Sequence, residues 1–152
     1  MKLSTRTRYG TKAMLDLAIH YAQGPILLKL IAMREGISES YLENLMTGLK
    51  TAGLVRTARG PQGGHFLARP PSQIKLSEIV IALEGPIALV DCIDDARLCY
   101  RSPSCVTRDV WQDLNKAITA VLERITLEEM AQKQRERAEQ ERPEKARAYR
   151  AV

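Results

Sequence analysis

Three cysteines carry the most distinctive chemistry in this sequence. Cys92, Cys99 and Cys105 lie within fourteen residues and are separated by six and then five positions. Thiolates are soft ligands that suit iron–sulfur clusters and zinc, and a flexible loop can bring three of them to one metal site. The same thiols could instead stay reduced and metal-free, or act as redox switches. Their odd number, without an export signal, argues against a disulfide framework.

A fourth ligand is missing from this spacing, because an iron–sulfur cluster normally takes four protein ligands. The candidates to replace it are Asp91, Asp94, Asp95, a buffer thiol, or no protein ligand at all. Of the two histidines, we expect His20 to be partly buried and structural, and we expect neither to be a cluster ligand. A cluster with incomplete protein ligation would be labile, which suits a sensor of iron or redox state.

The distribution of charge points to a second kind of chemistry. Residues 1–70 contain ten lysines and arginines but four acids, whereas residues 71–130 contain six and ten, respectively. A basic excess confined to one part of the chain is typical of a face that binds a polyanion. A solvated basic surface would give the same charge pattern. The secondary structure that carries these residues is needed to distinguish the two interpretations.

Helical periodicity organises the basic half of the chain. Apolar residues at spacings of three and four predict helices over 8–22, over 27–34 and up to Thr51. Gly36 suits the turn before the third helix, which Ser38 or Ser40 can cap. Ser40 also has Glu43 three residues on, the spacing of a capping box. Helix, glycine turn and helix in this order predict a helix-turn-helix.

A hairpin follows the predicted helix-turn-helix directly. Residues 54–59 and 65–69 have strand-like sequences, and the five residues Gly60–Gly64 that join them are rich in glycine and proline. A hairpin in this position is the wing of a winged helix. The fold class predicted is therefore mainly α with a small β-hairpin, as a winged helix-turn-helix domain with a long C-terminal dimerisation helix.

The polar residues of this unit are the candidates for reading DNA. Glu43 could accept a hydrogen bond from cytosine N4 and Asn44 could bridge adenine N6 and N7, while Arg59 on a slim hairpin could enter a narrow minor groove. We also expect His65, on the same hairpin, to face DNA or solvent. Alternatively, Glu43 only caps its helix and Arg59 is a solvated turn residue. The complete candidate DNA-binding set, with phosphate contacts included, is Ser38, Glu39, Ser40, Glu43, Asn44, Lys50, Arg56, Arg59 and Gly60.

The second half of the chain contains the predicted controller and the predicted dimer contact. A helix is expected over 76–83, and a long helix around 109–125 carries one apolar stripe, which suits packing on a second copy. Thr126 and Glu129 have capping-box spacing and open a short last helix. The predicted parts are a DNA-binding domain 1–71, a connecting helix and cysteine loop 72–107, a dimerisation helix with a short terminal helix 108–130, and a charged, disordered tail 131–152.

Several classes of function are disfavoured by the same sequence. No apolar run approaches the roughly 18–20 residues of a membrane helix, and no signal peptide is apparent, so we expect a cytoplasmic protein. There is no phosphate loop, no nucleophile–histidine–acid set and no recognisable carboxylate pair. We therefore expect a protein that is not an enzyme.

An ordered series of motifs resembles one family, the IscR-type regulators, whose relatives include NsrR and RirA. The motifs that carry the resemblance, besides the three cysteines, are Met1-Lys2-Leu3-Ser4, Arg8-Tyr9, Ala13-Met14-Leu15-Asp16, Ile37–Glu43, Arg59–Gly64, Trp111-Gln112-Asp113-Leu114 and Ile125-Thr126-Leu127. The resemblance implies a homodimeric winged-helix repressor or activator. It also implies an iron–sulfur cluster on the three cysteines, with 2Fe-2S slightly favoured over 4Fe-4S. Residues matching Ser40, Glu43, Asn44 and Arg59 lie at the DNA interface in the family.

The sequence departs from that family at the position of the fourth ligand. Arg108 stands where the IscR-like pattern has a histidine, and Arg8 stands where NsrR-like relatives have a carboxylate from the partner chain. The function expected is a homodimeric, sequence-specific transcription regulator whose binding to an operator is controlled by a cluster that senses iron, redox state or nitric oxide. The alternative is a winged-helix repressor without a cluster, controlled by thiol redox state or a partner protein.

Overall fold

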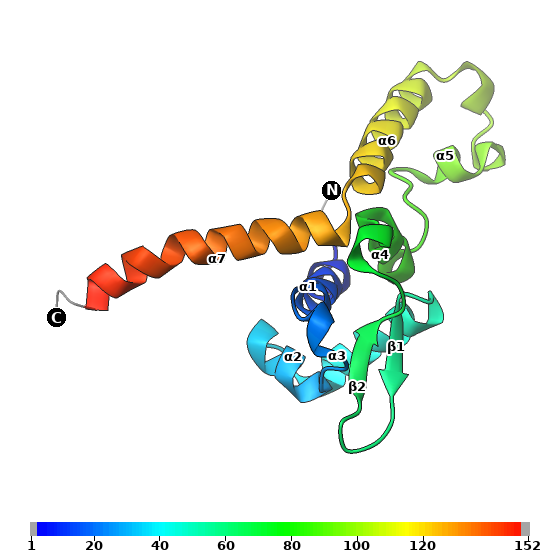
Figure 1. Ribbon diagram of the computed structural model, residues 1–152. Helices are drawn as coiled ribbons and strands as arrows, with labels where there is room; N and C mark the ends of the chain where they lie inside the picture. The colour runs from blue at the N-terminus through cyan, green and yellow to red at the C-terminus, as the bar shows by residue number, and fades with distance from the viewer. Residues whose placement is uncertain (1–2, 150–152) are drawn as a thin grey trace.

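The computed structural model describes residues 3–149 of the chain, with side chains described for residues 3–141. It is mainly helical with one antiparallel two-stranded hairpin, which confirms the predicted fold class (Figure 1). The elements are α1 Thr5–Ile19, α2 Leu28–Glu35, α3 Glu39–Thr51, β1 Val55–Ala58, β2 Gly64–Leu67, α4 Leu76–Glu84, α5 Asp91–Asp94, α6 Val106–Arg124 and α7 Leu127–Tyr149, with short 3-10 turns at Tyr21–Gln23, Pro71–Gln73, Ala96–Leu98 and Ser102–Ser104.

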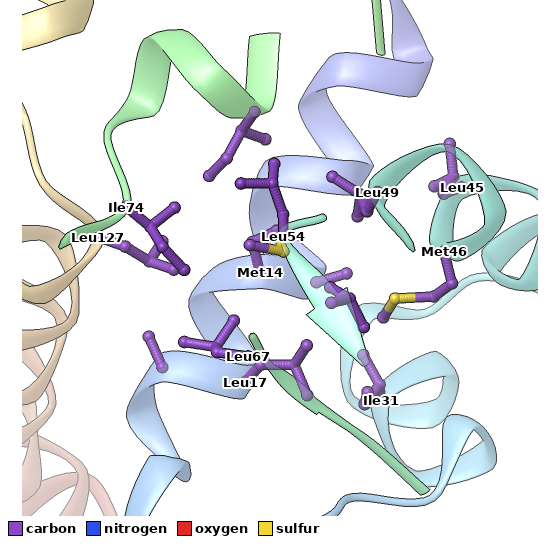
Figure 2. Packing of buried hydrophobic residues seen from close by; sticks show 14 of the residues in the cluster. Met14, Leu17, Ile31, Leu45, Met46, Leu49, Leu54, Leu67, Ile74 and Leu127 are labelled. Carbon is purple, nitrogen blue, oxygen red and sulfur yellow. The ribbon is translucent and has the colours of Figure 1, made fainter. Parts of the chain in front are cut away.

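One aliphatic core joins the helix-turn-helix to the hairpin. Met14 of α1, Leu49 of α3 and Leu54 before β1 are completely or almost completely buried, and Figure 2 shows their side chains in the same cluster. Leu67 of β2 and Ile74 complete the cluster from the other side. Burial of each such side chain contributes roughly 1.5–3 kcal/mol, so this core fixes how α3 and the hairpin lie relative to each other.

The last helix begins as the sequence predicts. The Thr126 amide donates to Glu129 Oε2 at 2.9 Å, and the Glu129 amide donates to Thr126 Oγ1 at 3.3 Å, which confirms the capping box. Leu127, in the first turn of α7, is completely buried against the core. The start of α7 is therefore part of the core of the winged-helix unit predicted over residues 1–71.

The length of α7 corrects the prediction of a short helix followed by a disordered tail over 131–152 as far as Tyr149, and residues 150–152 lie outside the described residues. The helix continues to Tyr149, and Figure 1 shows it extending away from the rest of the chain. Ala131 is buried, and Arg135 Nη2 donates to the carbonyl oxygen of Ile19 at 3.2 Å, where α1 ends. Residues 131–149 are mostly Ala, Glu, Gln, Lys and Arg, which are strong helix formers, so the anchored first turns can propagate.

The long helix α6 is poorly covered within one chain. None of its residues is buried, although it packs on α4. Its large exposed hydrophobic residues, with their exposed fractions, are Val106 at 75%, Val110 at 56%, Trp111 at 42%, Leu114 at 44% and Val121 at 49%. Among the residues that the structure describes, no helix is long and apolar enough to cross a membrane.

Candidate nucleic-acid interface and cysteine loop

The turn between α2 and α3 sets the start of the candidate recognition helix. Gly36 ends α2 in the left-handed conformation, with φ 65°, which glycine adopts without a steric penalty. Ser38 is the N-cap of α3, and its Oγ accepts a hydrogen bond from the Tyr41 amide at 3.2 Å. The predicted Ser40–Glu43 capping box is therefore wrong. Ser38 occupies the cap, which leaves the Glu43 carboxylate without a capping role.

All the predicted DNA-binding residues lie on exposed parts of the helix-turn-helix and hairpin. Within α3, Leu42, Leu45, Met46 and Leu49 face the core, so the polar residues face outward. The exposed residues of the candidate set are Ser38, Glu39, Ser40, Glu43, Asn44, Lys50, Arg56, Arg59 and Gly60. Exposure is what a base- or phosphate-binding side chain requires, but it does not by itself assign a contact.

Thr47 lies on the same outward face of α3, although it is not among the residues predicted to bind DNA. It is exposed, lies one helical turn after Glu43, and donates its hydroxyl to the Glu43 carbonyl oxygen at 2.9 Å. Thr47 lies four residues after Glu43 and three after Asn44, and this helical spacing is the sequence signal that could have found it. Thr47 therefore extends the exposed polar stripe of α3 toward Lys50.

A backbone contact ties the hairpin to the helix-turn-helix. The His65 amide donates to the Ile26 carbonyl oxygen at 2.8 Å, and the Ile26 amide donates to the His65 carbonyl oxygen at 2.9 Å. This bridge joins β2 to the segment just before α2, beside the main pairing of Ala58 with Gly64 in the hairpin. The bridge therefore holds the hairpin near the loop end of its ladder, and the exposed turn that contains Gly60 follows directly beyond it.

Gly64 allows this close approach. A Cβ atom at this position would lie 2.5 Å from the carbonyl carbon and oxygen of Ile26, which are backbone atoms that cannot move aside cheaply. We expect Gly64→Ala to lower the free energy of unfolding by about 2–3 kcal/mol in urea titrations. The matched control is Gly53→Ala, because Gly53 also has a positive φ but nothing within 4 Å of a Cβ. Equal losses in the two variants would contradict the close-packing account.

His65 differs from the expectation that it faces DNA or solvent. It is half-buried on β2, and its Nδ1 is buried without a hydrogen-bond partner among the described residues. Burial lowers the pKa of His65 below its usual value, and the nearby Lys50 lowers it further while Glu43 opposes the shift. The ring is therefore neutral at physiological pH and lies within electrostatic reach of two candidate DNA-binding residues of α3.

The cysteines lie in an irregular segment between α4 and α6. Each of the three thiols is free and half-buried. Within the part of the chain that the structure describes, no three His, Cys, Asp or Glu side chains come together as a metal site. The donors are chemically suited to a cluster, but this arrangement of the loop does not gather them.

Cys105 occupies the N-cap position of α6. Its Sγ lies 3.1 Å from Thr107 Oγ1. That contact lowers the pKa of Cys105 below its usual value, and the backbone amide of Arg108 acts in the same direction. The thiol at the start of α6 is therefore in a polar environment that favours its anionic form.

Arginines engage other groups of the loop. Arg108 Nε donates to the Cys92 carbonyl oxygen at 2.9 Å, which links the start of α6 to α5. Arg97 donates to both carboxylate oxygens of Asp95, from Nε and Nη2, each at 2.8 Å, and these bonds lower the pKa of Asp95. Of the candidate carboxylate ligands, Asp95 is thus already paired, whereas Asp91 and Asp94 are exposed.

His20, and Arg8 at the position where NsrR-like relatives have a carboxylate ligand, both lie outside the cysteine loop, on or at the end of α1. His20 is half-buried at the end of α1, and its Nδ1 lies 2.8 Å from the Asp16 carbonyl oxygen, as expected of a structural histidine. Arg8 is exposed on α1. Neither residue contributes to a metal site within the described chain.

Comparison with known proteins decides the family. Residues 3–133 match the family model described as Rrf2, an iron-dependent transcriptional regulator. The chain belongs to the Rrf2 family. It is 40% identical over 130 residues to protein rrf2 of Nitratidesulfovibrio vulgaris. The matching region covers 86% of this chain and 87% of that protein.

Solved structures of similar proteins share the fold over most of the chain. The CymR global cysteine regulator of B. subtilis has a TM-score of 0.74 and 38% identity, covering 87% of this chain and 97% of that one. The T. potens IscR structure has a TM-score of 0.73 and 43% identity, covering 88% of each chain. This Rrf2 family member is therefore a DNA-binding transcription regulator and not an enzyme.

Proposed function

We propose that this Rrf2 family member is a homodimeric, sequence-specific regulator whose DNA binding is controlled by an iron–sulfur cluster on Cys92, Cys99 and Cys105. The observation that carries the proposal is that the hairpin lies at one end of the folded molecule and α6 with the thiol-bearing loop lies at the opposite end (Figure 1). The end with the hairpin binds DNA, and the end with the thiol-bearing loop holds the cluster that responds to the signal.

The dimer is proposed on the exposed face of α6. Val110, Leu114 and Val121 are spaced by four and seven residues, so they share one face of the helix. A cavity of about 570 Å³ between α4 and α6, lined in part by Val80, Ile118 and Leu122, continues this apolar surface. A second copy of the same surface would cover it in a two-fold arrangement.

On DNA, the residues of α3 and the hairpin take different roles. Glu43 and Asn44 contact base edges in the major groove, and Lys50 and Arg56 contact phosphates. Arg59 enters the minor groove from the hairpin, where Gly60 lets the backbone approach closely. Ser38, Glu39 and Ser40, at the exposed N-terminus of α3, flank these contacts.

Replacing Glu43 with alanine tests base reading separately from affinity. We expect Glu43→Ala to relax the preference at one base pair of each half-site, by about tenfold, because a carboxylate accepts from cytosine but cannot bind phosphate. Total affinity should stay equal or rise. The measurement is sequencing of selected binding sites, followed by titration of single-base variants. Glu136→Ala on α7 removes the same charge as a control, and an unchanged base preference in Glu43→Ala would contradict the assigned role.

The three thiols supply most of a cluster's ligands, and the loop has to close around it. Thiolates are the ligands such clusters prefer, and an exposed carboxylate, Asp91 or Asp94, or an exogenous ligand is proposed for the remaining position. When bound, the cluster supplies a centre that responds to iron supply, redox state or nitric oxide. A 2Fe-2S cluster is the form proposed here, and 4Fe-4S is the other outcome of the same measurement.

Anaerobic purification of the full chain tests the cluster. We expect bound iron and sulfide and a brown protein, with the visible absorbance lost in Cys92→Ala and kept in Ser104→Ala, a control between Cys99 and Cys105. The reason is that loss of one of three thiolates leaves too few protein ligands. A colourless, metal-free anaerobic preparation that still binds its operator would rule the cluster out.

A second candidate is a regulator in which the thiols themselves respond to oxidation. Two observations favour it, namely that the thiols do not gather in this structure and that the pKa of Cys105 is lowered. A solved relative, CymR, is named as a cysteine regulator. Disulfide or sulfenate at Cys99 or Cys105 in protein without iron, detected by mass spectrometry, would support this candidate.

A further inference from the structure

A cavity of about 390 Å³ lies beside the thiol of Cys99. Its lining includes Cys99, Tyr100, Ser102 and Arg108, which come from the cysteine loop and the start of α6. The cavity is within the size range of small-molecule sites, at the small end. Because it opens next to a free thiol, a ligand in it would be placed to react with that thiol.

A buried hydroxyl in this lining lacks a partner. Ser102 has an exposed fraction of 6%, and its Oγ makes no hydrogen bond to any described residue. A buried polar group without a hydrogen bond costs roughly 1–3 kcal/mol, so such groups usually have a partner. The oxygen is closed off from the cavity, so recognition of a ligand there has to come from Arg108 and not from this hydroxyl.

The cavity also carries an uncompensated positive charge. Among the described residues, the only hydrogen bond of the Arg108 side chain runs from Nε to the Cys92 carbonyl oxygen, and no carboxylate pairs with this guanidinium. Arg97, which also lines the cavity, is neutralised by Asp95. The unused N–H groups of Arg108 are suited to a carboxylate, which accepts two parallel hydrogen bonds from a guanidinium.

We infer that this cavity binds the carboxylate of a small oxidised thiol, a carboxylate-bearing disulfide, and directs it to Cys99. The Cys99 thiolate attacks one sulfur of the ligand's disulfide, so that a new S–S bond forms at Cys99 and the ligand's S–S bond breaks. The other half of the ligand leaves as a thiolate, and the disulfide is the oxidant. The inference rests on the proposed function in one respect, because a Cys99 modified in this way can no longer hold a cluster.

The test compares two disulfides of similar shape on the reduced, metal-free full-length protein. Dithiodipropionate carries carboxylates, and its diamide is uncharged. We expect dithiodipropionate to modify Cys99 before Cys92 or Cys105, at a rate about tenfold above that of the diamide, as measured by intact mass and peptide mapping over time. A charged hydrogen bond of ordinary strength gives a preference of this size.

Variants assign the preference to Arg108. Arg108→Ala should make the two rates equal, whereas Arg108→Lys, which keeps the charge, should retain part of the preference and shows that loss is not caused by misfolding. The matched control is Arg101→Ala, because Arg101 lies over the Tyr100 ring and is not part of the cavity lining. It removes the same charge and should keep the full preference.

Three results would overturn the inference. They are equal rates for the two disulfides in the unmodified protein, equal losses in Arg108→Ala and Arg101→Ala, or first modification at Cys92 or Cys105. Operator binding and anaerobic iron content are measured on the same preparations. A failure of the proposed cluster would leave the Cys99 result in place, and a failure at Cys99 would leave the cluster measurement unaffected.

Discussion

Replacing Leu114 with glutamate is expected to convert the proposed dimer into a monomer and to weaken operator binding by at least about a hundredfold. Leu114 lies at the centre of the exposed apolar face of α6, and a carboxylate there would be buried without a partner on association. When one subunit of a dimer has bound its half-site, the second subunit is held close to the other half-site, which raises the overall affinity. A monomer lacks this increase in affinity. Sedimentation velocity and titration of an operator measure the two effects.

A second variant on α6 distinguishes disruption of the apolar face from the effect of an added negative charge. Ala120→Glu introduces the same carboxylate on an exposed position that shares the polar side of the helix with Asp113 and Lys116. This variant should remain a dimer and keep its affinity. A Leu114→Glu protein that stays dimeric would show that α6 is not the dimer contact.

Replacing Arg59 with alanine is expected to weaken operator binding by about tenfold to a hundredfold. Arg59 is exposed directly after β1 and has no partner among the described residues, so its guanidinium is available to the minor groove. The slope of log affinity against log salt should also fall by about one, since one cation fewer displaces counterions. Fluorescence anisotropy at several salt concentrations gives both quantities.

The control for this variant is Arg137→Ala. Arg137 is exposed on α7, which extends away from the hairpin (Figure 1). The Arg137→Ala protein should keep the operator affinity of the unmodified protein and the same slope of log affinity against log salt. If Arg59→Ala and Arg137→Ala behave alike, the hairpin arginine does not contact DNA.

The DNA-binding half of the fold was largely predictable from the sequence. Helical spacing, Gly36 and the Gly/Pro-rich segment after Arg59 are local signals. The spacing gives each helix one apolar face to bury, and the glycines and proline favour turn conformations. The choice of Ser38 over Ser40 as the cap was not predictable, because both side chains are good caps. The partial burial of His65 was also missed, since it depends on a bridge to Ile26, far away in the sequence.

The cysteine half was less predictable for a physical reason. Soft thiols identify a class of chemistry, but the irregular loop has no periodicity to fix where they lie. The bond from Arg108 to Cys92 and the buried hydroxyl of Ser102 are tertiary features that no local pattern records. For α7, the strong helix formers after Met130 were a local signal for a longer helix, whereas the contact of Arg135 with the end of α1 is a tertiary feature.

The most direct test of the account is the operator affinity of the anaerobic protein with its cluster and after the cluster has been removed by a chelator. The account predicts that the two affinities differ by about tenfold or more, within the range of ordinary coupling between sites. A variant with Cys92, Cys99 and Cys105 all replaced by alanine should show one affinity under both treatments. Equal affinities for the loaded and stripped forms of the unmodified protein would contradict control of DNA binding by the cysteine loop's cluster.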